Sequence, residues 1–144
     1  MDAVLINDAE LRELTQEPNL AKAARILQSW GPRVVVAKRG EYGAALFTAD
    51  GFFALPAYPL EQVLDPTGAG DSFAGGFVGF LAAHGGEATP DVLKLAMAYG
   101  TAIASYNVEE FGTERVQRLT RAEIDERVAE FRRMTQFEPL PLRV

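Results

Sequence analysis

The sequence contains no cysteine and a single histidine, His84, among its 144 residues. The lack of cysteine excludes disulfides, thiolate metal ligands and a cysteine nucleophile. One histidine cannot build a multi-histidine metal cluster, and it leaves little basis for a serine–histidine catalytic pair. We expect His84 to be a surface residue near a helix end, because Gly85-Gly86 follows it.

Long apolar runs and an excess of positive charge are missing as well. No apolar run approaches the roughly 20 residues that a membrane-spanning helix needs. The N-terminus lacks the basic region and apolar core of a signal peptide. With 14 basic and 20 acidic residues the net charge is −6, which argues against non-specific binding to nucleic acids or anionic membranes. We therefore expect a cytoplasmic protein without a nucleic-acid or membrane partner.

The bulk composition is that of a folded domain. Hydrophobic residues make up 48% of the chain and charged residues 24%, as in ordinary globular proteins. A chain of 144 residues is long enough for one real core. Since no repeat or linker divides the sequence, we expect a single domain over residues 1–144.

Apolar runs and turn residues predict the strands. Residues 3–6 and 34–37 are continuous apolar runs, which predict strands buried on both faces. The position of the first is unusual, because nothing precedes it in the chain to cover it. Asp50-Gly51 separates two apolar runs, residues 44–47 and 52–55, and predicts a hairpin.

Capping residues and helical spacing predict the helices. Asn7 is a suitable N-cap, with Glu10 three residues on. A second helix is predicted over residues 20–30, with one apolar face formed by Ala23, Ile26, Leu27 and Trp30. Three more are predicted after residue 70, after Thr89-Pro90 and after the capping box that begins at Thr120. Small residues in the Thr89-Pro90 helix indicate close packing on another element. The element order argues for an α/β fold with a partly parallel sheet.

The sequence DPTGAGDSFAGG, residues 65–76, is the strongest functional signal. A loop that opens directly into a helix leaves free N–H groups at the positive end of the helix dipole, where they suit a phosphate or an oxyanion. Asp71 is the side chain placed to handle a proton there. The loop is not a Walker A motif, and Phe73 stands where a dinucleotide fingerprint has its third glycine. Local sequence leaves open an ordinary glycine-rich helix start in which Asp71 merely complements the dipole.

The same stretch resembles the C-terminal signature of the ribokinase/PfkB carbohydrate kinases. Three other stretches are similar to that family in the same order: residues 7–10, its Asn-x-x-Glu motif; residues 34–44, its nucleotide-side strand and turn; and residues 93–105 with Phe111-Gly112, its late adenine-side helix. The resemblance covers about residues 3–112. It implies a ribokinase-like α/β fold and an ATP-dependent kinase that acts on a hydroxyl of a sugar or nucleoside.

The resemblance also implies roles for the glycine loop. Asp71 would be the catalytic base, taking the proton from the substrate hydroxyl as it attacks the γ-phosphate of ATP. The N–H groups of Gly68, Ala69, Gly70 and Asp71 would form the anion hole. Asp65 and Thr67 would shape the loop and help to hold a monovalent cation such as K⁺, as in some family members.

Further residues are assigned by the same resemblance. Asn7 and Glu10 would organise Mg²⁺ through its waters, although a capping box explains both residue types without a metal. Three residues would approach the ribose and phosphates of ATP: Lys38, Gly40 and Gly43. A simple turn between strands is the alternative. Tyr99 would lie along the adenine, and core packing is its alternative.

Members of the family are much longer than this chain, and the N-terminal half supplies their sugar-binding residues, a Gly-Gly motif and a lid. The chain therefore looks like the C-terminal, nucleotide-binding portion of a PfkB-type kinase, truncated at the N-terminal side. We expect little or no activity from it alone, and homo-oligomerisation through the surface that the missing half would cover. The alternatives are a non-catalytic α/β fragment that self-associates and a nucleotide- or anion-binding module without turnover. The sequence does not name the sugar or nucleoside.

Overall fold

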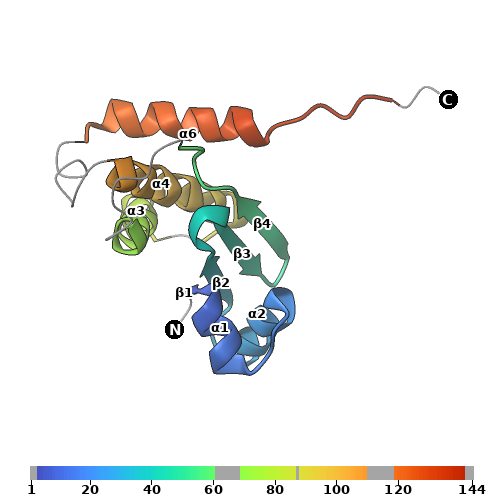
Figure 1. The fold of residues 1–144 in the computed structure, drawn as a ribbon. Helices are drawn as coiled ribbons and strands as arrows, with labels where there is room; N and C mark the ends of the chain where they lie inside the picture. Colours follow the sequence, from blue (N-terminus) through green and yellow to red (C-terminus); the bar gives the residue numbers. More distant parts are fainter. Residues whose placement is uncertain (1–2, 61–68, 87, 110–118, 142–144) are drawn as a thin grey trace.

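The computed structural model describes residues 3–60, 69–86, 88–109 and 119–141 (Figure 1). Within the described ranges, two short helices lie between the first and second of four strands, and three longer helices follow the fourth strand. The strands are β1 (Ala3–Asn7), β2 (Val34–Lys38), β3 (Ala44–Thr48) and β4 (Gly51–Leu55). The helices are α1 (Asp8–Thr15), α2 (Leu20–Ser29), the 3-10 turn η1 (Gly40–Tyr42), α3 (Ala69–Ala83), α4 (Pro90–Glu109) and α6 (Arg121–Thr135).

The sheet has the order β1-β2-β3-β4 and is mixed. β1 and β2 run parallel, while β2, β3 and β4 are antiparallel neighbours. The predicted α/β fold with a partly parallel sheet is thus confirmed. The predicted hairpin also forms, but its turn is shifted by one residue. Thr48 pairs with Gly51, so Ala49 and Asp50 make the turn and the glycine begins β4.

Alternate residues of the buried strands build two separate cores. Val34 and Val36 of β2 face a core that contains α3 and α4. Val35 and Ala37 face a second core, which α1 and α2 complete. Side chains alternate across a strand, so one continuous apolar run serves both faces. Figure 1 shows the resulting layers, with α1 and α2 on one side of the sheet and α3, α4 and α6 on the other.

The expectation that the first strand is buried on both faces is wrong. Every residue of β1 is only half-buried, whereas β2 is fully buried from Val34 to Ala37. Within the described part of the chain β1 is the edge of the sheet, and β2 is its hydrogen-bonded neighbour. Apolar composition alone therefore overstated its burial, because burial also needs neighbours on both sides.

Helices α3 and α4 approach each other closely at two glycines. A Cβ on Gly100 would stand 2.8 Å from the Phe73 carbonyl oxygen, and one on Gly76 would stand 3.0 Å from the Cα of Gly100. Neither position has room for a side chain, since real contacts are not this short. The close packing predicted from the small residues of this helix is confirmed.

The predicted starts of α4 and α6 are confirmed, whereas the apolar face predicted for α2 is only partly confirmed. Thr120 caps α6 through a complete capping box, and Thr89 accepts a hydrogen bond from the N–H of Val92 at the start of α4. In α2, however, Trp30 is 56% exposed and Ala24 is fully buried in its place. A small residue suffices where the helix lies close to the sheet.

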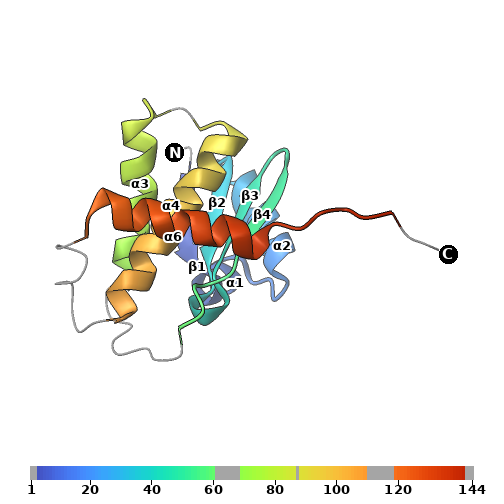
Figure 2. The same cartoon turned by 90° about the horizontal axis from the view of Figure 1, so that it is seen from above.

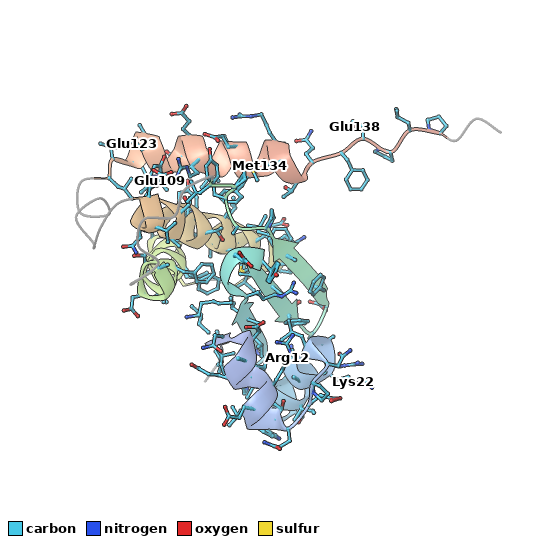
Figure 3. All side chains as sticks on the ribbon, viewed as in Figure 1. Arg12, Lys22, Glu109, Glu123, Met134 and Glu138 are labelled. Atoms are coloured by element: carbon cyan, nitrogen blue, oxygen red, sulfur yellow. The ribbon has the colours of Figure 1, made fainter. Side chains whose placement is uncertain are left out.

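Helix α6 packs on α4, which it crosses in Figure 2. Arg127 of α6 donates hydrogen bonds to the hydroxyl oxygen of Ser105 (2.9 Å) and to the carboxylate of Glu109 (2.7 Å). Its guanidinium also lies 4.0 Å from the ring centre of Tyr58 and 3.7 Å from that of Tyr106. In Figure 3, Glu109 lies where the end of α4 meets α6.

Within the described ranges, every helix falls short of the combination of length and apolar character that crossing a membrane would require. Residues 136–141 follow α6 without helix or strand.

Candidate functional site

The carboxyl ends of the two parallel strands bring Asn7 and Lys38 side by side. The two residues are register partners at the ends of β1 and β2. Parallel strands end at the same edge of a sheet, so both side chains belong to one edge. In open α/β sheets this edge is where ligands bind.

Lys38 also reaches the first turn of α3. Its Nζ lies 3.3 Å from the point where a Cβ on Gly70 would stand. The ammonium group therefore lies close to the helix backbone at Gly70. Asp71 follows in the same first turn and is exposed. One edge of the sheet thus collects a lysine, a helix N-terminus and a carboxylate, two parts of which suit an anion.

Asn7 and Glu10 hold each other at the start of α1. The Asn7 side-chain oxygen accepts a hydrogen bond from the N–H of Glu10 (2.7 Å), and its Nδ2 donates to Glu10 Oε1 (2.6 Å). Asn7 is therefore the N-cap, as predicted. Glu10 bonds to the side chain of Asn7, whereas the acid of a standard capping box bonds to the backbone N–H of the capping residue. A role in organising Mg²⁺ stays a prediction, and one oxygen of Glu10 is left over for it.

The turn after β2 depends on two glycines. Gly40 and Gly43 have φ of 59° and 92°, backbone conformations that other residues rarely adopt. At Gly43 a Cβ would also overlap the carbonyl oxygen of Leu55. The turn is closed by a hydrogen bond from the N–H of Arg39 to the carbonyl oxygen of Gly43 (2.7 Å). These contacts explain both glycines through the turn itself, and their contact with ATP stays a prediction.

Two adjacent cations stand at this edge of the sheet. Lys38 and Arg39 are both half-buried, and neither forms an ion pair with a carboxylate among the described residues. The Nε of Arg39 is buried without a hydrogen-bond partner. Of the two, Lys38 is the cation that the structure places beside the N-terminus of α3.

The structure places Tyr99 apart from these groups. Its ring stacks on Phe80 of α3 with the ring centres 4.7 Å apart, and Phe80 lies about 15 Å along α3 from Gly70 at 1.5 Å per residue. The hydroxyl of Tyr99 donates a hydrogen bond to Asp125 of α6 (2.6 Å), and the Arg121 guanidinium lies 5.1 Å from the ring centre of Tyr99. The described contacts favour packing, and adenine binding by Tyr99 stays a prediction.

The contacts between Tyr99 and Asp125 shift the pKa values of these two residues in opposite directions. Burial, and then the hydrogen bond to Asp125, raises the pKa of Tyr99. Hydrogen bonds from Tyr99 and Arg121 lower the pKa of Asp125. Both shifts favour a neutral phenol beside an ionised carboxylate, which is the state that the hydrogen bond requires.

Part of the predicted glycine loop lies outside the described residues. Asp65, Thr67 and Gly68 belong to that part, so their roles stay predictions. Ala69, Gly70 and Asp71 are described and form the first turn of α3. His84 is exposed near the end of the same helix, as predicted, with its ring stacked on Phe80 at 4.1 Å.

Comparison with known proteins decides the family. Residues 1–118 match the family described as pfkB family carbohydrate kinase. The chain belongs to this family. A matching region of this extent includes both strand ends, the turn after β2 and the glycine loop.

Individual PfkB relatives are kinases of different small molecules. The chain is 43% identical over 81 residues to a cytidine kinase of Thermococcus kodakarensis and 32% identical over 118 residues to a deoxyribokinase of Salmonella typhi. It covers 28% and 36% of these two proteins, so it spans about a third or less of their length.

Solved structures agree on the fold. Aminoimidazole riboside kinase from Salmonella enterica, complexed with aminoimidazole riboside and an ATP analogue, is 26% identical with a TM-score of 0.76. Fructokinase from Vibrio cholerae, in a form bound to fructose, ADP and calcium ion, is 20% identical with a TM-score of 0.79 and supports the fold alone. The likeness covers 88% of this chain in both cases, and 42% and 41% of the two kinases. The ribokinase-like α/β fold is confirmed.

Sequence reasoning missed two arginines of this PfkB chain. Arg39 could have been noticed, because two adjacent cations directly follow a buried strand. Arg127 carries no local signal, since its partners Tyr58, Ser105 and Glu109 lie 18 to 69 positions away along the chain.

Proposed function

We propose that this chain provides the nucleotide side of an ATP-dependent kinase that phosphorylates a hydroxyl of a sugar or nucleoside. The observation that supports this most directly is the proximity of Lys38 to Gly70 at the start of α3. The Nζ of Lys38 lies 3.3 Å from the point where a Cβ on Gly70 would stand. This contact brings a cation against free backbone N–H groups in a PfkB chain whose Asp71 follows at once. Positioning and charge stabilisation of this kind carry most of phosphoryl-transfer catalysis.

In the proposed reaction Asp71 accepts the proton of the substrate hydroxyl. The hydroxyl oxygen bonds to the γ-phosphorus of ATP, the bond from that phosphorus to the β–γ bridging oxygen breaks, and ADP leaves with the electron pair. The N–H groups of Ala69, Gly70 and Asp71, together with Gly68, would hold the transferring phosphoryl group. Lys38 would balance its charge from the side of β2.

The residues at the edge of the sheet fit a triphosphate. Lys38 Nζ lies close to Gly70 in the first turn of α3, where a cation and a helix N-terminus both suit phosphate oxygens. Asn7 and Glu10 would hold Mg²⁺ through its waters, and the ion, when bound, would neutralise phosphate charge. Asp65 and Thr67 would hold K⁺. A cytoplasmic location also stays a prediction.

Titration with a non-hydrolysable ATP analogue tests the nucleotide side. We expect the wild-type chain to bind it, Lys38→Gln to bind more weakly and Asp71→Asn to bind as the wild type does, because the amide keeps the shape of the carboxylate. Failure of the wild type to bind at millimolar concentration would contradict the proposal.

Phosphate transfer to a panel of sugars and nucleosides tests the base. We expect Asp71→Asn to abolish any transfer that the wild type shows, since an amide cannot accept the proton. Unchanged turnover in Asp71→Asn would exclude this residue as the base.

A second candidate function is self-association, with or without nucleotide binding. It is favoured by the position of β1, which is half-buried and stands at the edge of the described sheet. A strand edge with unpaired N–H and carbonyl groups is a template for pairing with a second copy. We expect dimers or larger species in sedimentation at high concentration; a strictly monomeric chain would contradict this.

A further inference from the structure

The segment that follows α6, residues 136–141, is exposed along its whole length and is called the tail below. Its two large apolar side chains, Phe137 and Leu140, are 84% and 81% exposed. In Figures 1 and 2 the tail runs away from the body of the molecule, and Figure 3 shows Glu138 on it beyond the end of α6. A projecting segment with two such side chains is suited to binding another chain.

The prolines of the tail allow it to pair as a strand on one side only. In an extended chain, the backbone N–H groups of consecutive residues point to opposite sides. Those of Glu138 and Leu140 therefore point to one side, and Pro139 and Pro141, which have no N–H, belong to the other. Proline is accepted in a strand where that side faces solvent. Proline also favours extended backbone in the residue before it, so the tail loses little conformational freedom when it pairs.

Strand β4 offers a matching edge. Within the described sheet it is the last strand and is bonded to β3 alone. Thr48 and Gly51 pair directly across a two-residue turn, so they exchange the closing hydrogen bonds. Bonded and non-bonded pairs alternate from there, which directs the N–H and carbonyl groups of Phe52 and Ala54 away from β3. Both residues are exposed, so this edge is open to an added strand.

We propose that the tail of one copy of this chain adds to β4 of a second copy as a parallel strand. Phe137 lies opposite Phe52, and Pro139 lies opposite Ala54. The partner is thus a second copy of the chain, bound by addition of a strand to a sheet edge. The inference goes beyond the proposed kinase function and does not depend on it. It also uses the edge of the described sheet opposite to β1.

The backbone groups of the two segments match in this register. In a parallel pair, each residue of one strand donates to the residue before its opposite number and accepts from the residue after it. The carbonyl oxygens of Phe52 and Ala54 therefore receive the N–H groups of Glu138 and Leu140. No hydrogen bond is required of a proline, and the proline side prevents a further strand from being added.

The side chains agree with the same register. Because side chains alternate between the two faces of a strand, Phe137 lies on the face of Phe52, whose side chain is 64% exposed. Glu138 lies on the other face, opposite Phe53. The Nζ of Lys94 is 5.5 Å from the ring centre of Phe53, and no carboxylate within the described ranges forms an ion pair with Lys94. A cavity of about 160 Å³, lined in part by Phe53 and Lys94, gives room for the Glu138 carboxylate.

Exchange of the two charges tests the predicted contact. Sedimentation equilibrium compares the wild type with Glu138→Lys, Lys94→Glu and the double variant. We expect each single variant to weaken self-association by about tenfold, because like charges then meet, and the double variant to regain it. Glu126→Lys is the matched control, since Glu126 is exposed on α6, and it should associate as the wild type does.

Two further measurements test the backbone pairing and the register. Glu138→Pro removes the N–H that binds β4, whereas Glu138→Gln keeps it, so Glu138→Pro should associate about tenfold more weakly than Glu138→Gln. Because the sequence has no cysteine, engineered cysteines report on one contact at a time. A mixture of Ala54→Cys and Pro139→Cys chains should form a mixed disulfide faster than Trp30→Cys with Pro139→Cys, although Trp30 is also exposed.

Several results would overturn the inference. A wild type that stays monomeric at high concentration excludes it. If the double charge variant associates no better than the single variants, or Trp30→Cys crosslinks as fast as Ala54→Cys, the tail does not lie on β4. If every variant associates as the wild type does, the contact is elsewhere, and association through β1 stands instead. Binding of an ATP analogue should be the same in all variants, so the proposed kinase function is tested separately.

Discussion

Replacing Arg127 by methionine should detach α6 from its support. The substitution keeps an unbranched apolar stem but removes the charge that bonds to Ser105 and Glu109 and stacks on Tyr58 and Tyr106. The side chain of Arg127 is 11% exposed, and that of Glu109 is 28% exposed. Removing one partner of a buried ion pair costs about 3–5 kcal/mol. Because Glu109 can regain some water, we expect the lower end, about 3 kcal/mol.

The separate contacts, taken as additive, would contribute more than this, so about 3 kcal/mol is the lower estimate. Hydrogen bonds to charged groups contribute about 1.5–3 kcal/mol, and each cation–π contact adds about 0.5–1 kcal/mol. A loss of about 3 kcal/mol corresponds to a fall in Tm of about 6–12 °C for a chain of this size.

Urea and thermal unfolding followed by circular dichroism measure this loss. Arg132→Met is the matched control, because Arg132 lies on the same helix and is exposed; its effect should stay within about 0.5 kcal/mol. A double-mutant cycle with Glu109→Gln should show coupling between the two residues of about 1–2 kcal/mol. An Arg127→Met protein within 1 kcal/mol of Arg132→Met would refute the reasoning.

Two further predictions concern helix packing and pH. Gly100→Ala should lower the free energy of unfolding by about 1–3 kcal/mol, since its Cβ would meet the Phe73 carbonyl oxygen at 2.8 Å. Gly75→Ala, in open space on α3, should raise it by about 0.5–1 kcal/mol, and urea unfolding of both variants checks the contrast. The hydrogen bond to Glu130 and then burial raise the pKa of Tyr58, so this contribution to stability is complete below the ordinary tyrosine pKa of about 10 and declines as pH rises through the folded value. Thermal scans from pH 8 upward should show a shallower decline in Tyr58→Phe, and an identical decline in both proteins would contradict the assignment.

The sequence predicts the local features of this fold better than its burial. Asn7 and Thr120 cap helices where their side-chain chemistry predicts, because a cap needs only residues within one turn. Burial depends on neighbours that are distant in the chain. For that reason β1 turned out half-buried and Trp30 exposed, although both are apolar.

The residues of the candidate site also differ in how far the sequence predicts them. The proximity of Lys38 to Gly70 joins two stretches that the family resemblance had already singled out separately. For Gly43, the clash with the end of β4 explains the residue physically, which the spacing of glycines could not do. The sequence did not single out Arg39, because a sequence does not show that an Nε is buried without a hydrogen-bond partner.

The arrangement of the strands has a consequence for how the chain folds during synthesis. All four strands lie within residues 3–55, and each pairs with the next one in the chain. These four described strands, with α1 and α2 on one face, can therefore pair before α3 has emerged from the ribosome. The other face then waits as a bare apolar surface until α3 and α4 arrive. Translation speed after residue 55 thus sets how long that surface stays open to chaperones or to a neighbouring nascent chain.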